Sequence, residues 1–128
     1  MIMYIQINPD LEMSIYEQLS MQIMIGVIRK DLQDGDMLPS VRSLAADLGV
    51  NMHTVNKSYH ELEKKGLIQI IPKSGAVIRT TNRKLSEEEK NRTLDSLKPI
   101  IVEALVLGMN EEDILSLAQS IIQNLKEE

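Results

Sequence analysis

The sequence predicts a mainly α fold with a small β-hairpin, and three observations support this prediction. Apolar residues recur at helical spacing in five segments, and each segment follows a Ser or Asn that can cap a helix. Two short apolar runs lie between the third and fourth segments, separated by a turn that contains Pro and Gly. Three helices followed by a hairpin form a winged helix-turn-helix, and a short two-helix segment follows it.

The composition is that of a small aliphatic protein of 128 residues. With three Tyr and no Phe or Trp, the core must be built from Ile, Leu, Val and Met. The absence of Cys excludes disulfides and Cys-based zinc sites. The apolar residues 1–7 are too few for a signal peptide, and no apolar run is long enough to span a membrane. We therefore expect a cytoplasmic protein, and nothing in the sequence calls for a cofactor.

The net charge of −5 is divided unevenly along the chain. Residues 40–84 carry eight basic and three acidic side chains, a net charge of +5. The flanking residues 1–39 and 85–128 carry net charges of −4 and −6. A basic middle between acidic ends is typical of a module that binds a polyanion and has a separate assembly segment. On charge alone, a solvated charge imbalance explains the pattern equally well.

The N-terminal elements are a short arm and a long helix. Residues 4–7 are expected to form an extended arm that Pro9 ends. The first helix is predicted over residues 15–33, because Ser14 begins a capping box and apolar residues follow at four-residue steps. Gly35 is expected to stop this helix.

Two short helices joined by a tight turn come next, and together they form the helix-turn-helix. The first begins at the N-cap Ser40 and ends at Gly49, and the second begins at the N-cap Asn51 and ends at Gly66. Residues 67–78 then follow as strand, turn and strand, which is the hairpin of the wing.

Two capped helices make up the C-terminal segment, and Pro99 is expected to kink the first of them. Ser86 begins the first helix with a capping box, Gly108 ends it, and Asn110 caps the second. Two apolar-faced helices without a third element cannot bury both faces, so we expect a second copy of the chain to cover them. The residues expected at this dimer interface are Leu94, Leu97, Ile101, Leu105, Ile114, Leu117, Ile121 and Leu125.

These elements divide the chain into three predicted parts. They are a winged helix-turn-helix domain over residues 1–80, a linker over residues 81–85 and a helical dimerisation segment over residues 86–128. The alternative for the last part is that its helices fold back on the winged domain of their own chain.

The second helix of a helix-turn-helix lies in the major groove of DNA, with its N-terminal residues at the base edges. Asn can bond to adenine, Thr can contact a base edge, and Lys suits guanine or phosphate. The residues of this helix predicted to face DNA are Asn51, Met52, His53, Thr54, Asn56 and Lys57. A solvated polar helix face is the alternative for any one of them.

Further DNA contacts are predicted from the preceding helix and from the wing. Arg42 would meet a phosphate or a guanine unless it pairs with a neighbouring acid. Ser40 and Ser43 can donate to phosphates, although Ser40 is also explained as a cap. Gly75 is expected to supply the left-handed residue of the wing turn and to allow close approach. The residues predicted to contact DNA from the wing tip are Lys73, Ser74 and Gly75.

Four stretches resemble one family: Ile15-Tyr16-Glu17-Gln18-Leu19, Leu38-Pro39-Ser40-Val41-Arg42-Ser43-Leu44-Ala45, Val50-Asn51 through Tyr59, and Leu62-Glu63-Lys64-Lys65-Gly66-Leu67-Ile68. They are similar to the GntR family of bacterial transcription regulators, without gaps over residues 15–78. The two-helix tail resembles that of the YtrA subgroup, in which this segment dimerises and binds no ligand. The subgroup usually has Pro-Asn where this chain has Met52-His53, and its wing is usually richer in Arg and Gly. The resemblance implies that DNA is faced by Arg42, Asn51, His53, Thr54, Lys57 and the wing around residues 73–75.

The leading hypothesis is a sequence-specific DNA-binding transcription regulator, a repressor that binds a pseudo-palindromic operator as a homodimer. A winged-helix adaptor that binds an acidic protein is the alternative, and a small apolar effector at the dimer seam is a third hypothesis. His53 and His60 lack the further ligands that a metal site needs. The sequence also shows no catalytic triad, phosphate-binding loop or paired carboxylates, so we expect neither a metal site nor an enzyme.

Overall fold

The computed structural model describes residues 5–80 and 84–127, and the chain divides into two compact units, residues 1–81 and 82–128. The described part of the first unit runs α1 (Ile15–Ile28), β1 (Met37–Leu38), α2 (Val41–Leu48), α3 (Met52–Lys64), β2 (Ile68–Ile71) and β3 (Gly75–Ile78). The second unit contains α4 (Glu87–Val106) and α5 (Glu111–Lys126). The predicted fold class, a winged helix-turn-helix followed by two helices, is confirmed.

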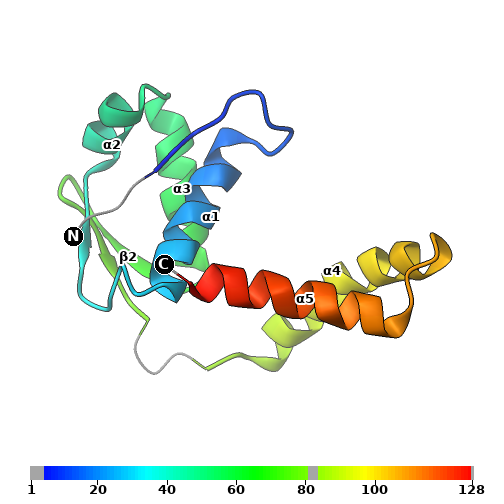
Figure 1. The fold of residues 1–128 in the computed structure, drawn as a ribbon. Coiled ribbons are helices and arrows are strands. Elements are labelled where there is room, and N and C mark those ends of the chain that lie inside the picture. Colours follow the sequence, from blue (N-terminus) through cyan, green and yellow to red (C-terminus); the bar gives the residue numbers. More distant parts are fainter. Residues whose placement is uncertain (1–4, 81–83, 128) are drawn as a thin grey trace. The chain divides into compact units, whose positions relative to one another are not determined.

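One hydrophobic core joins the helices and the sheet of the first unit. α1 and α3 lie side by side, and α2 packs against α3 (Figure 1). Tyr59 and Leu62 of α3 are fully buried in one cluster with Leu19 of α1 and Ile78 of β3. Burying each aliphatic side chain of this kind stabilises the fold by about 1.5–3 kcal/mol. The buried side of α3 is therefore the one that carries Val55, Tyr59 and Leu62, as their helical spacing in the sequence predicts.

The first helix ends earlier than the predicted residue 33. Lys30 adopts the left-handed backbone conformation (φ 66°) and ends α1 without a glycine. The chain then turns back, and Leu32 is buried against Gly26, where an added Cβ would lie 3.0 Å from Leu32. The prediction that Gly35 stops the helix is wrong, because Gly35 lies farther on, in the loop before β1.

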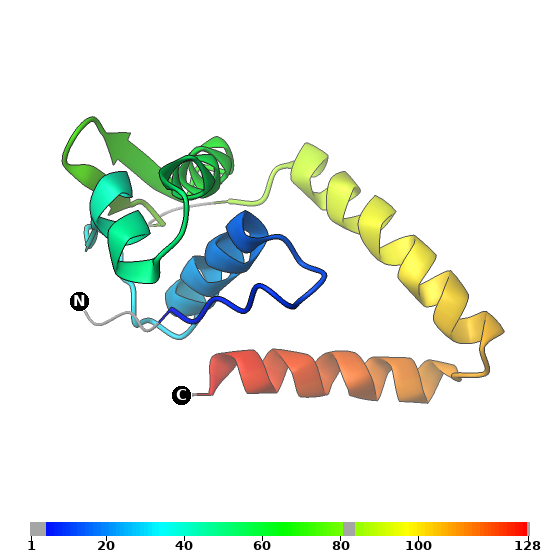
Figure 2. The same cartoon turned by 90° about the horizontal axis from the view of Figure 1, so that it is seen from above.

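A third strand, β1, is missing from the sequence prediction. Met37 and Leu38 pair with Val77 and Ala76, so β3 is the central strand in the order β1-β3-β2. The sequence alone does not reveal this strand, because two residues are too few to show the alternation typical of a strand. The predicted β2–β3 hairpin is confirmed (Figure 2).

The predicted caps of the helix-turn-helix are confirmed. The Ser40 hydroxyl accepts the backbone N–H of Ser43 at 3.1 Å, and the Asn51 side chain accepts that of His53 at 2.8 Å. Gly49 ends α2 in the left-handed conformation (φ 69°). These local bonds fix where α2 and α3 begin, and therefore which residues stand at their exposed N-terminal ends.

The arm before α1 is held by side-chain amides rather than paired as a strand. Gln18 Oε1 accepts the Asn8 N–H at 2.9 Å, and Gln18 Nε2 donates to the Asn8 carbonyl at 2.9 Å. Gln22 makes the same two bonds with the backbone of Gln6. Gln18 and Gln22 are four residues apart on the helix, a rise of about 6.0 Å. Gln6 and Asn8 are two residues apart in the extended arm, a distance of roughly 6.6 Å. Because the two distances are similar, each Gln side chain lies opposite one of these arm residues. Tyr4, which the prediction places in this arm, lies outside the described residues.

In the second unit, the predicted capping box at Ser86 with Glu89 is present, and the predicted cap Asn110 also forms a capping box, with Asp113. α4 continues through Pro99, so the proline does not end the helix. Over the described residues neither helix has a buried side chain, and Figure 2 shows α4 and α5 meeting only near the turn that joins them. None of the helices described is long and apolar enough to cross a membrane.

Candidate nucleic-acid interface

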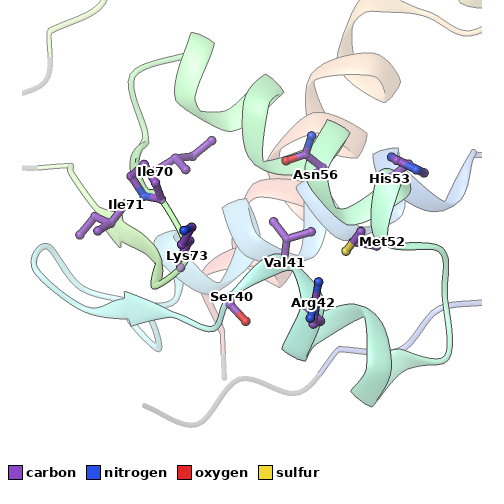
Figure 3. A pocket seen from close by; sticks show the side chains of 11 residues that line it. Ser40, Val41, Arg42, Met52, His53, Asn56, Ile70, Ile71 and Lys73 are labelled. Carbon is purple, nitrogen blue, oxygen red and sulfur yellow. The ribbon is translucent and has the colours of Figure 1, made fainter.

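The N-terminal ends of α2 and α3 and the tip of the wing border one groove in the first unit. Its volume is about 660 Å³. Figure 3 shows Arg42 of α2, His53 of α3 and Lys73 of the wing around it. Of the predicted DNA-contacting residues, the groove brings together Ser40, Arg42, Met52, His53, Asn56, Lys73 and Gly75.

The remaining predicted contacts do not line this groove: Ser43, Asn51, Thr54, Lys57 and Ser74. Asn51 is exposed, but its side-chain oxygen is already used to cap α3. Thr54 is half-buried, whereas Ser43 and Ser74 are exposed beside residues that do line the groove.

Lys57 points toward α1. Its Nζ lies 4.0 Å from the centroid of the Tyr16 ring, which is a cation–π contact worth about 0.5–1 kcal/mol at an exposed site. A contact between Lys57 and DNA would compete with this interaction. Sequence spacing shows that Lys57 is exposed on α3 but does not show which neighbour it meets.

The wing turn differs in detail from the prediction. The left-handed residue at its tip is Lys73 (φ 68°), and the Ser74 N–H donates to the Ile71 carbonyl at 3.0 Å. Gly75 also has positive φ (129°), and a Cβ there would lie 2.2 Å from the Leu38 carbonyl oxygen. The close approach that requires Gly75 is therefore to the chain's own backbone at β1, which locks the wing against the start of α2.

Tyr59 of α3 is a positioning residue that the predicted DNA contacts do not include. Its hydroxyl donates to the Pro39 carbonyl at 2.7 Å, and the ring is completely buried. Burial raises the pKa of the Tyr59 hydroxyl above its ordinary value, so it remains a donor at neutral pH. A Tyr on a buried stripe is itself a signal for such a bond, because a buried hydroxyl usually finds a partner.

The groove combines positive charge with apolar surface. Arg42 and Lys73 are exposed cations, and the N-terminal ends of α2 and α3 add the positive ends of two helix dipoles. Val41, Met52 and Ile71 supply apolar lining, and Met52 is 42% exposed. This arrangement can bind phosphates at its edges and base edges at its floor. Among the described residues, no cluster of three His, Cys, Asp or Glu side chains could hold a metal ion.

Comparison with known proteins gives the family. Residues 11–78, which include the helix-turn-helix and the wing, match the bacterial regulatory proteins of the gntR family. The chain belongs to the GntR family. The GntR regulator HTH-type transcriptional repressor YtrA of Bacillus subtilis (strain 168) is 34% identical over 124 residues, 95% of each chain.

Two solved structures are similar over nearly the whole chain. A transcriptional antiterminator from Listeria monocytogenes EGD-e has a TM-score of 0.91 at 32% identity and covers 98% of this chain and 94% of its own. YtrA from Sulfolobus acidocaldarius, described as a GntR-family transcription factor, has a TM-score of 0.56 at 32% identity, covering 96% of this chain and 100% of its own. The predicted similarity to the YtrA subgroup is confirmed.

Membership of the GntR family makes this chain a DNA-binding transcription regulator rather than an enzyme. It also favours DNA binding over the adaptor hypothesis. The match extends through the C-terminal helices, because YtrA of Bacillus subtilis aligns with 95% of the chain.

Proposed function

We propose that this GntR-family chain is a repressor that binds a pseudo-palindromic operator as a homodimer. The observation that carries the DNA-binding part is the groove in which Arg42, His53, Asn56 and Lys73 converge from two helix ends and the wing. The repressor part is supported by YtrA of Bacillus subtilis, which is named a transcriptional repressor. Occupying a promoter requires no further domain.

Each side chain of the groove has a role in this proposal. Arg42 and Lys73 bind phosphates, because both are exposed cations that line the groove. Arg42 stands at the start of α2, and Lys73 stands at the tip of the wing. Asn56 bonds to N6 and N7 of adenine, and His53 contacts a neighbouring base edge. The Ser40 hydroxyl accepts from Ser43 and keeps its own proton free for a phosphate oxygen.

The dimer is supported by apolar surface that one chain leaves uncovered. At the predicted interface, Leu94 is 60% exposed and Leu117 is 54% exposed. Others of that set exposed to a similar extent are Leu97, Leu105 and Ile121, while Ile101, Ile114 and Leu125 are half-buried. Apolar residues outside the predicted interface are exposed as well, since Val106 is 80% and Leu107 is 76% exposed. Helices with this much apolar surface are normally covered by a partner.

The test begins with selection of bound genomic fragments by the purified protein, followed by gel-shift titration of a selected duplex. We expect the Arg42→Ala variant to lose at least tenfold in affinity and Arg92→Ala to bind like wild type. Arg92 is an exposed residue of α4 and provides the matched control for loss of one positive charge. Unchanged binding by the Arg42→Ala variant would contradict the proposed site.

Sedimentation and transcription assays test the assembly and the direction of regulation. We expect a dimer in solution and a footprint of two half-sites centred about one helical turn, roughly 34–36 Å, apart. Adding the protein to a transcription reaction on the selected promoter should lower the yield of transcript. A monomer that retains full affinity, or a rise in transcript, would contradict the corresponding part of the proposal.

A further inference from the structure

Five of the eleven residues that line the groove are apolar, which is not expected of a site that binds phosphates alone. Val41, Met52, Ile70, Ile71 and Pro72 line it beside the cationic residues. In Figure 3, Val41 and Met52 are seen between the side chains of Arg42 and Asn56. Phosphates and most base edges offer charge or hydrogen bonds, and an apolar lining gains nothing from them.

Met52, Ile71 and Pro72 are the exposed members of this set, and Met52 is the one that belongs to α3. Val41 and Ile70 are only partly exposed and pack against the hydrophobic core. Met52 is 42% exposed and is the first residue of α3, at the end of the helix that reads bases. Its unbranched thioether adapts to the shape of an apolar partner.

The major groove of DNA has one apolar group on its base edges, the C5-methyl of thymine. We propose that Met52 reads a thymine methyl in each operator half-site, an inference that rests on the proposed operator binding. Asn56 lies one helical turn farther along the same face of α3, a rise of about 6 Å. Two base steps span about 6.8 Å, so an adenine bonded by Asn56 lies within about two steps of that thymine.

The experiment uses a duplex recovered by selection from genomic fragments. Each thymine of one half-site is replaced in turn by deoxyuridine, which removes only the C5-methyl and leaves base pairing intact. We expect one position at which the wild-type protein loses about fourfold in affinity, the value of one buried methyl group. Replacement in both half-sites should cost about fifteenfold, because the two contacts in a dimer add.

Variants assign the effect to one side chain. Met52→Ala should bind the thymine and deoxyuridine duplexes equally, whereas Met52→Leu should retain most of the discrimination. Met21→Ala is the matched control, because Met21 is similarly exposed (44%) but lies on α1 outside the groove. It should discriminate like the wild type.

The outcomes separate this inference from the proposed function. If the wild type selects no specific duplex, operator binding fails and the inference fails with it. If a specific duplex is bound but every deoxyuridine duplex binds equally well, only the inference is overturned. Discrimination that survives in Met52→Ala also overturns it, since another side chain would then be reading the methyl.

Discussion

The hydroxyl of Tyr59 donates a 2.7 Å hydrogen bond to the carbonyl oxygen of Pro39, and this bond ties the middle of α3 to the start of α2. Pro39 stands between Leu38, whose carbonyl touches the wing at Gly75, and Ser40, which caps α2. One short segment therefore sets the spacing of the three elements that border the groove. Substitutions of Leu38 or Pro39 should therefore affect DNA binding, although neither residue lines the groove.

Replacing Tyr59 by Phe removes the bond while retaining the ring. We expect the free energy of unfolding to fall by about 0.5–1.5 kcal/mol, because the hydrogen bond to the partly buried Pro39 carbonyl is lost. Urea titration followed by circular dichroism measures this change. Tyr16→Phe is the matched control, since it retains the ring that Lys57 contacts and should be nearly neutral. Equal effects of the two variants would contradict this role.

The same hydroxyl makes stability depend on alkaline pH. Burial raises the pKa of Tyr59 in the folded state above its value of about 10 in the unfolded chain. Above pH 10 the unfolded state loses this proton first, so the stability that is complete below pH 10 falls as pH rises. Measured between pH 9 and pH 11, the free energy of unfolding should decline more steeply for wild type than for Tyr59→Phe. Parallel declines would show that Tyr59 does not contribute.

Two lysines hold left-handed backbone conformations, at Lys30 and Lys73. This conformation costs a non-glycine residue about 1–2 kcal/mol, so glycine at either position should raise the midpoint of thermal unfolding. The two variants should differ in DNA binding. Lys73→Gly should weaken operator binding and lower the slope of log affinity against log salt concentration by about one, because a phosphate contact is lost. Lys30→Gly serves as the control and should bind normally; a similar loss there would argue against a specific role for the wing lysine.

Gly75→Ala should be severely destabilising. The new Cβ would lie 2.2 Å from the Leu38 carbonyl oxygen, and the backbone φ of 129° is itself unfavourable for alanine. We expect a loss above about 3 kcal/mol, since both a clash and backbone strain are introduced. Gly35→Ala isolates the strain, because Gly35 has φ of 91° with nothing within 4 Å of an added Cβ. If the two variants lose equal stability, the contact between wing and β1 is unimportant.

The features that could be predicted from sequence are those determined within a few residues. The caps at Ser40, Asn51, Ser86 and Asn110 are local bonds between a side chain and a nearby N–H, and all of them form. Because the caps place the helix ends, more than half of the predicted DNA contacts do line one groove.

The features that could not be predicted depend on distant partners. α1 ends near Lys30, whose left-handed backbone is unfavourable, because the burial of Leu32 against Gly26 offsets this cost. The residues around Lys30 do not indicate that Leu32 will be buried. β1 exists only through its pairing with β3. Lys57 meets Tyr16 across the α1–α3 packing, so its direction is set by another helix. The DNA contacts and the domain boundaries remain predictions.

The close contact between Gly75 and Leu38 affects which DNA sequences the protein can bind. The wing is joined to β1 by backbone contact and by strand pairing, and the loop at its tip is only residues 72–74. A wing held this rigidly cannot move away from the helices to widen the groove for differently shaped DNA duplexes. We expect the nucleic acid to do the adapting, so that base steps which bend or compress cheaply are favoured at positions that no side chain touches.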